Sequence, residues 1–197
     1  MVPEPSGADV GAALDAFVER YVAACPRLTE PFDAAWRSPC ENGEPYLDDT
    51  GERRVPWQPL RRHGPADDFA GLERALEFAI HPDIKDYYGR YWSGGLEAEA
   101  DDGHVSLLQL WNADDADRLV ENLIGHALAK RRARAPFTVF FACTEPDSEL
   151  FLSVDNGSGA VVLEAPGRRP LRPVADSLAD FLSRLRPAPP PQQTAVE

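Results

Sequence analysis

The feature that most constrains this chain is a change in its hydrophobic period near residue 96. From there apolar residues alternate with acids, as Leu96, Ala98 and Ala100 alternate with Glu97, Glu99 and Asp101. The dipeptide Asp102-Gly103 favours a hairpin turn, and residues 104–111 follow as a second strand. Since other parts of the chain have helical spacing, we expect this hairpin to join a sheet that is flanked by helices.

The acids of the first strand are predicted to form a ladder. Successive side chains of a strand point to opposite faces, so Glu97, Glu99 and Asp101 share one face. On the outer face of a sheet, such a ladder serves either solubility and the protection of an edge strand, or binding. The second strand is apolar on both faces, which is typical of a central position in a sheet.

Apolar residues at helical spacing predict four helices, which cover residues 8–24, 69–80, 114–132 and 174–185. Pro26 and Pro82 end the first two, and Asn112 is expected to cap the third. A short helical turn follows the second helix at residues 87–91. Further strands are predicted at residues 137–143, 150–154 and 160–163, and the last two pair across Asn156-Gly157.

These elements predict a single α+β domain over residues 1–187, with a mixed or antiparallel β-sheet flanked by helices. Residues 31–65 are rich in proline and are expected to form an ordered but irregular excursion. Its aromatic residues (Phe32, Trp36, Tyr46 and Trp57) should tie it to the body of the domain. Residues 188–197 are proline-rich and are predicted to be a disordered tail.

The charge of the chain restricts its partners. The formal net charge is −13, which repels nucleic acid and anionic lipid and favours basic partners. The acids are concentrated: residues 97–121 carry eight acids and one base, Arg118, whereas residues 151–197 carry five of each. The acidity therefore belongs to particular surfaces, and we expect neither a nucleic-acid partner nor binding to a membrane by charge alone.

Signals for a membrane span, for secretion and for thiol chemistry are weak. The longest apolar run covers seven residues, 137–143, whereas a bilayer needs about 20. The first eleven residues lack the basic start and apolar stretch of a secretory signal. Cys25, Cys40 and Cys143 are odd in number and widely spaced, which favours reduced cysteines in a cytosolic protein over disulfides or a zinc site.

The candidate catalytic groups have poor spacing. His126 and Glu121 lie five residues apart, which rotates them by roughly 140° on a helix and does not suit a metal pair. Cys40, with His63 or His104 as a base, lacks any surrounding signature of a nucleophile. Gly157–Gly159 lies in a hairpin turn without a following helix, so a nucleotide loop is not supported. We expect no catalytic residue, no metal and no cofactor.

Two further groups of residues allow two interpretations. Asp114, Asp115 and Asp117 open a helix whose last turn is basic, which suits the helix dipole but also offers a binding surface. Aromatic residues near the hairpin are either core or the floor of a groove that receives Lys and Arg through cation–π contacts. These residues are Tyr87, Tyr88, Tyr91, Trp92 and Trp111.

Several segments taken together resemble the Syd family. They are Ser38-Pro39-Cys40, Trp57-Gln58-Pro59, Glu73-Arg74-Ala75, Leu107-Leu108-Gln109-x-Trp111, Glu121-Asn122-Leu123-Ile124-Gly125-His126 and Ser177-Leu178-Ala179-x-Phe181-Leu182. The match runs in order over nearly the whole chain. It implies a monomeric α+β protein related to the SUKH superfamily, with a concave acidic surface that binds cytosolic loops of SecY. It also implies peripheral association with the cytoplasmic side of the inner membrane through SecY, bearing on the quality or assembly of SecYEG.

We therefore expect a docking surface for basic SecY loops, formed or bordered by Glu97, Glu99, Asp101, Asp102, Asp114, Asp115, Tyr87 and Trp111. Cytoplasmic loops of membrane proteins carry excess Lys and Arg, which such a surface would select. One rival hypothesis is an immunity or inhibitor protein of the SUKH type, whose acidic surface caps a basic toxin or nuclease. Another is an enzyme whose site has no recognised motif.

Overall fold

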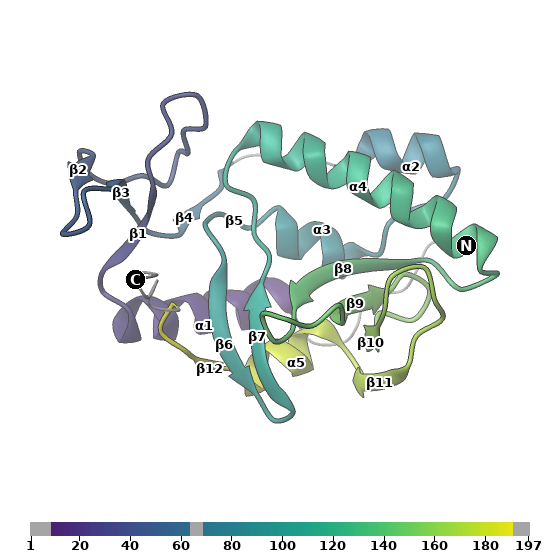
Figure 1. The fold of residues 1–197 in the computed structure, drawn as a ribbon. Coiled ribbons are helices and arrows are strands. Elements are labelled where there is room, and N and C mark those ends of the chain that lie inside the picture. The colour runs from purple at the N-terminus through teal and green to yellow at the C-terminus, as the bar shows by residue number, and fades with distance from the viewer. Residues whose placement is uncertain (1–8, 64–68, 191–197) are drawn as a thin grey trace.

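The computed structural model describes residues 9–63 and 69–190 (Figure 1). Within these residues the helices are α1 (Val10–Ala24), α2 (Ala70–Leu76), α3 (Pro82–Tyr88), α4 (Ala113–Arg132) and α5 (Leu178–Arg184). The side chain of Asp9 caps α1 by accepting from the amide of Ala12, and Asn112 caps α4 as predicted. Helix α1 packs against α5 and α3, and α2 packs against α4.

The main sheet has seven strands in the order β11-β10-β9-β8-β7-β6-β12 and curls into a half-barrel. Its strands are β6 (Leu96–Ala100), β7 (Gly103–Leu107), β8 (Thr138–Cys143), β9 (Phe151–Asp155), β10 (Val161–Glu164), β11 (Arg172–Ala175) and β12 (Arg186–Pro187). Every neighbouring pair is antiparallel. The prediction of an α+β domain with an antiparallel sheet flanked by helices is confirmed.

The proline-rich excursion holds more regular structure than expected. β1 (Leu28–Pro31), β3 (Arg53–Trp57) and β2 (Tyr46–Leu47) form a small antiparallel sheet, and β4 (Leu60–Arg61) pairs with β5 (Tyr91–Trp92). Pro31 lies in edge strand β1, which tolerates proline, and Pro56 of the central strand β3 lies beyond the two residues that pair with β2, so neither prevents the pairing of β1 with β3. The ring of Trp57 meets that of Trp111 edge to face at 5.9 Å, so this aromatic residue ties the excursion to the body as predicted.

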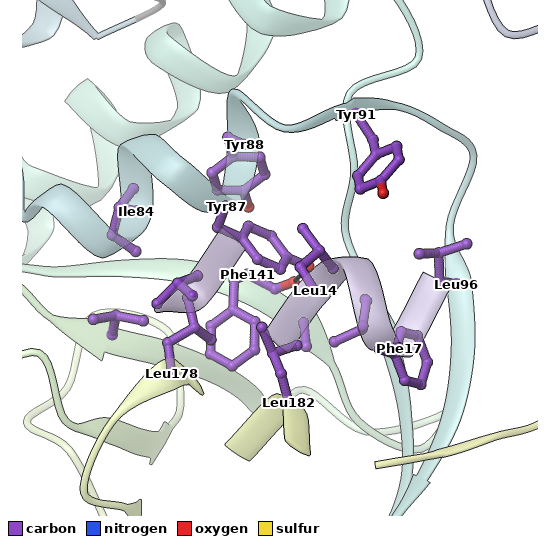
Figure 2. Packing of buried hydrophobic residues seen from close by; sticks show 14 of the residues in the cluster. Leu14, Phe17, Ile84, Tyr87, Tyr88, Tyr91, Leu96, Phe141, Leu178 and Leu182 are labelled. Carbon is purple, nitrogen blue, oxygen red and sulfur yellow. Dashed lines mark hydrogen bonds between the residues drawn. The ribbon is translucent and has the colours of Figure 1, made fainter. Parts of the chain in front are cut away.

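The core lies between the sheet and the α1–α5 layer. Leu14 of α1 lies with Leu178 and Leu182 of α5 around Phe141 of β8, and Phe17 of α1 extends the same cluster toward Leu96 (Figure 2). All of these side chains are buried, and each contributes about 1.5–3 kcal/mol by leaving water. The helical stripe of residues 8–24 therefore covers this core as predicted.

Three predicted elements differ from the structure. The last helix begins at Leu178 rather than residue 174, because Ala175 pairs with Val161 in the sheet and the hydroxyl of Ser177 caps α5. The second helix ends at Leu76, where the following residue adopts a left-handed conformation with φ 62°. The second strand of the hairpin ends at Leu107 rather than at residue 111.

At its C-terminal end the described chain continues one residue past β12 in contact with β6. The amide of Ala188 donates to the carbonyl of Glu97 at 3.0 Å, and Ala188 is buried. The rest of the predicted tail falls mostly outside the described residues, which end at 190. None of the described helices is both long and apolar enough to cross a membrane.

Candidate partner-binding surface

The β6–β7 hairpin separates apolar and polar side chains onto two faces. Leu96 and Ala98 are buried against the core, whereas Glu97 and Glu99 point outward. In the register of the hairpin, Glu97 lies opposite Ser106 and Glu99 lies opposite His104. The predicted alternation is therefore confirmed for both glutamates, which share the outer face with a histidine that the prediction did not include.

These four residues, Glu97, Glu99, His104 and Ser106, form what we call the surface cluster. The carboxylate of Glu97 lies 2.7 Å from Nε2 of His104 and accepts from the hydroxyl of Ser106 at 2.8 Å. The Nδ1 atom of His104 lies 3.4 Å from the carboxylate of Glu99. Partial burial lowers the pKa of His104, but the hydrogen bonds to the two glutamates outweigh it, and the net effect raises that pKa.

The two aspartates of the hairpin lie in its turn. Asp101 and Asp102 connect Ala100 to Gly103, and Gly103 has a φ of 129°, which favours glycine. Asp102 pairs with Arg172 at 2.7 Å, and Asp101 faces Arg184 and Arg186, each at 3.8 Å. Asp101 is therefore not a third rung inside the strand, because the chain turns one residue earlier than predicted.

A pocket of about 220 Å³ opens beside this turn. Its apolar lining comes from Val105, Leu150, Leu152, Leu163, Val174, Phe181 and Leu185. Charged residues of both signs surround it, namely Asp101, Asp102, His104, Glu145, Arg172 and Arg184. The carboxylate of Glu145 accepts from the amide of His104 at 3.1 Å, which fixes the β8–β9 connection against the hairpin. The arrangement suits an apolar side chain from a charged segment.

Tyr87 does not belong to any surface. Its side chain is fully buried, and its hydroxyl donates to the carbonyl of Leu108 at 3.1 Å. Its ring meets those of Tyr88 and Phe141 edge to face, within the core shown in Figure 2. The sequence allowed Tyr87 to be either a core residue or the floor of a groove, and the structure places it in the core. The expectation that Tyr87 belongs to the docking surface is therefore wrong.

Trp111 joins the excursion to the body of the domain. Its indole N–H donates to the carbonyl of Trp36 at 2.9 Å, and its carbonyl accepts from the hydroxyl of Ser38. The ring is only partly buried and also meets Trp57. These contacts hold the β1–β3–β2 sheet in place, so the geometry gives Trp111 a structural role at the border of the hairpin.

The two predicted aspartates of α4 differ from one another. Asp115 accepts from the amide of Trp111 at 3.0 Å, and its own amide donates to Asn112 at 2.9 Å, so it completes the cap of the helix. Asp114 is exposed. Asp115 therefore has the structural role that the sequence left open, whereas Asp114 remains available to a partner.

Comparison with known proteins identifies the family. The family model described as Syd protein (SUKH-2) matches residues 11–187. This chain belongs to the Syd family. A Syd protein from Pseudoalteromonas atlantica is 38% identical over 185 residues, covering 90% of this chain and 96% of the relative. A Syd protein from Colwellia psychrerythraea is 41% identical over 165 residues, covering 80% of this chain and 80% of the relative. One from Hahella chejuensis is 41% identical over 176 residues, covering 87% of this chain and 88% of the relative.

In this Syd-family chain, the candidate catalytic histidine belongs to a buried cluster of four residues: His126, Lys130, Thr138 and Glu164. The Nε2 atom of His126 lies 2.9 Å from the hydroxyl of Thr138, which donates to Glu164 at 2.6 Å. The ammonium of Lys130 is bonded to the other oxygen of Glu164. Burial lowers the pKa of His126, Glu164 opposes that shift and Lys130 adds to it. The partner of His126 is therefore Glu164 rather than Glu121.

Cys40 lacks the environment of a nucleophile. It is buried, and burial raises the pKa of its thiol to about 11, which is the opposite of activation. Its sulfur lies 3.0 Å from the hydroxyl oxygen of Ser38, whose proton goes to the carbonyl of Trp111. Among the described residues, no group of three or more His, Cys, Asp or Glu side chains is arranged to hold a metal ion.

Two features of this Syd-family site escaped the sequence analysis. His104 is predicted only as a candidate base for Cys40, although a turn at Asp102-Gly103 already places it opposite Asp101, on the face of the glutamates. The observed turn, one residue earlier, places it opposite Glu99. The pocket draws its lining from the hairpin, the β8–β9 connection, β10, β11 and α5. No local pattern brings such distant segments together, so the pocket had no sequence signal.

Proposed function

We propose that this protein is a non-catalytic SecY-interacting protein, and that the outer face and turn of the β6–β7 hairpin bind a basic cytosolic loop of the SecY translocon. The observation that carries the proposal is the gathering of Glu97, Glu99, Asp101 and Asp102 on one hairpin. Three of them are exposed, at positions 99, 101 and 102. Membership of the Syd family supports the role that the resemblance implied.

The physical basis is charge complementarity. Cytosolic loops of membrane proteins carry excess Lys and Arg, and a surface of opposite sign speeds their association and selects among them. Exposed ion pairs contribute only about 0.2–1 kcal/mol each, so binding depends on several charges acting together. Glu97 is held in position by His104 and Ser106 before a partner arrives, which lowers the entropic cost of that contact.

The pocket beside the turn supplies the apolar part of this interface. An apolar side chain of the same loop enters between Val105, Val174 and Phe181, while neighbouring basic residues of the loop face Asp101 and Asp102. Interfaces commonly combine one buried apolar anchor with a charged rim. In this proposal Asp114, at the start of α4, offers a separate acidic contact, and the chain acts as a monomer without a cofactor on the cytoplasmic side of the inner membrane. Docking then bears on the quality or assembly of SecYEG.

A pull-down with SecYEG-containing membranes tests this proposal. Replacing Glu99, Asp101 and Asp102 with Lys should abolish binding, because three attractive contacts become repulsive. A control variant with Lys at Glu44, Asp49 and Glu121, three exposed acids elsewhere, carries the same change in charge and should bind. Circular dichroism should show both variants folded.

The salt dependence of binding is a second test of the same contact. Binding should weaken between about 50 and 500 mM salt, as the Debye length falls from roughly 14 to 4 Å. Equal binding by the two triple variants would show that the hairpin is not the site. Tight stoichiometric capture of a basic nuclease in place of SecY would instead favour an immunity protein of the SUKH type.

A further inference from the structure

The C-terminal end of α4 and the turn between β10 and β11 concentrate positive charge in an acidic protein. Their exposed arginines are Arg131, Arg132, Arg134, Arg168 and Arg169, and we call this group the basic end. Residues 131–137 and 165–170 contain no acid. In the part of the chain that the structure describes, none of the five forms an ion pair, so their charge faces outward uncompensated.

The two segments of the basic end are fixed to each other. The guanidinium of Arg169 donates to the carbonyl of Arg134 at 2.6 Å. The ammonium of Lys130 donates to the carbonyl of Arg168 at 2.9 Å while it pairs with buried Glu164. Lys130 and Glu164 thus cancel each other inside the domain and anchor the turn. The arginines are therefore held as one patch.

An apolar groove of about 290 Å³ adjoins the arginines, between α2 and α4. Leu76, Phe78, Ile124, Leu128 and Phe137 line it, and Arg131 lies among them. Phe78 is 38% exposed and Leu128 is 47% exposed, although both are large apolar side chains. The ring of Phe78 lies 5.2 Å from that of Phe137, which supports it from below. The basic end therefore combines cations with accessible apolar side chains.

We propose that the basic end binds directly to the surface of an anionic phospholipid bilayer. Arginine forks match phosphate geometry, and each basic residue near an anionic membrane attracts it measurably. Phe78 and Leu128 reach the boundary between headgroups and acyl chains, as apolar residues of interfacial helices do. Nucleic acid would also attract the arginines, but it has no apolar chains to cover Leu128 and the other aliphatic side chains of the groove.

The net charge of −13 does not prevent this contact. Electrostatic attraction extends over a Debye length of about 8 Å at physiological salt. Helix α4 has 20 residues, so its acidic start lies about 30 Å from its basic end, several Debye lengths away. Glu77, next to Phe78, is exposed and subtracts one charge locally. The field at the membrane is therefore set by the arginines rather than by the chain as a whole.

This inference goes beyond docking on SecY, because it requires no protein partner. A chain that touches headgroups through the basic end leaves the β6–β7 hairpin free (Figure 1). Contact of the basic end with lipid and of the hairpin with SecY would together hold the hairpin close to the membrane surface, where the cytosolic loops of SecY lie. Failure of one contact leaves the other measurable, since vesicles without SecY report only on the basic end.

Flotation of the full chain with protein-free vesicles tests the proposal. The chain should float with vesicles of equal parts phosphatidylglycerol and phosphatidylcholine and not with phosphatidylcholine alone. Replacing Arg131, Arg132 and Arg168 with Ala should lower the partition coefficient about fivefold per residue, or on the order of 100-fold together. Replacing Arg27, Arg53 and Arg118, which are exposed elsewhere, removes the same charge and should change it little.

A separate variant tests the apolar contact of Leu128 with the bilayer. Leu128→Ser should reduce flotation several-fold without unfolding, because Leu128 is half exposed. The proposal would be overturned if the wild-type chain failed to float at low salt, or if both arginine triples floated equally. It would also be overturned if transfer RNA bound more tightly than vesicles and depended on the same three arginines.

Discussion

The surface cluster and the buried cluster both combine a histidine with a glutamate and a hydroxyl, but the pKa values of their histidines shift in opposite directions. Each places a histidine beside glutamate on one face of the main sheet. His104 stands in a hairpin between two carboxylates, and these raise its pKa. His126 projects from α4 onto Phe140 and Phe151 of the sheet, where burial lowers its pKa. Two carboxylates outweigh partial burial at His104, whereas deeper burial together with the Lys130 ammonium outweighs Glu164 at His126.

The two clusters also differ in what their charges can do. In the buried cluster, Glu164 is satisfied by Lys130 and Thr138 and faces no solvent. In the surface cluster, Glu99 keeps half of its side chain in water. Charges of the first kind specify how α4 sits on the sheet, and those of the second kind can meet a partner. We therefore expect the largest effects on stability from the first and effects on binding from the second.

Removing Lys130 should give the largest loss of stability. Lys130→Met leaves the carboxylate of Glu164 buried without its cation, which should cost about 3–5 kcal/mol in the free energy of unfolding. Denaturant titration measures the loss. Arg131→Met, one residue along, is the control and should change stability by less than about 0.5 kcal/mol, because Arg131 is exposed.

The double variant Lys130→Met/Glu164→Leu sharpens this result. It removes both charges, so it should recover much of the stability that the single variant loses. If Lys130→Met unfolded no more easily than Arg131→Met, the buried cluster would not be a tightly coupled ion pair.

Sequence reasoning identified one cluster in part and missed the other. The outward placement of Glu97 and Glu99 follows from the period of a strand alone, so it could be predicted. Lys130 and Glu164 are 34 positions apart, and no local pattern joins them. The end of α4 looked like a uniform basic turn, although Lys130 points inward and the arginines beside it point outward. Only the packing of α4 on β10 separates them.

The same limit explains the errors in the fold and in the site. The stripe of α1 was predictable because helical spacing is local. Residues 174 and 175 match the spacing of the following helix, and only pairing with β10 assigns them to β11. Tyr87 is a residue type that often occurs at binding surfaces, but contacts with β8 and with the segment around Leu108 bury it. Local patterns thus gave elements, and tertiary contacts decided which side chains remain accessible.

His126 should make the protein less stable in mild acid. Its folded-state pKa is lowered, so the unfolded chain binds the proton more readily and stability falls as pH drops below the ordinary value of about 6.5. The hydroxyl of Thr138 donates to Glu164, so neutral His126 donates from Nε2 to Thr138. His126→Gln preserves such a donor and removes the titration.

Denaturant titrations of wild type and His126→Gln between about pH 7 and pH 5 check this prediction. Wild type should lose stability relative to the variant as the pH falls. Carboxylates elsewhere titrate in both proteins and cancel in the difference. A difference that stays constant, or that grows in favour of wild type, would contradict the proposed neutral state of His126.

His104 should show the opposite and smaller effect. Its folded-state pKa is raised, so the folded protein binds the proton more tightly, and the resulting stability is fully present below about pH 6.5. That stability is lost as the pH rises through the folded-state pKa. The effect is smaller because His104 is partly exposed and its bonds to Glu97 and Glu99 are screened by solvent.

The stability of wild type relative to His104→Gln should therefore shrink between about pH 6 and pH 8. Glu97→Gln removes the closer carboxylate, at 2.7 Å, and should make this difference smaller still. If the difference instead grew with pH, His104 would resemble His126, and the contrast between an exposed and a buried histidine–glutamate cluster would fail.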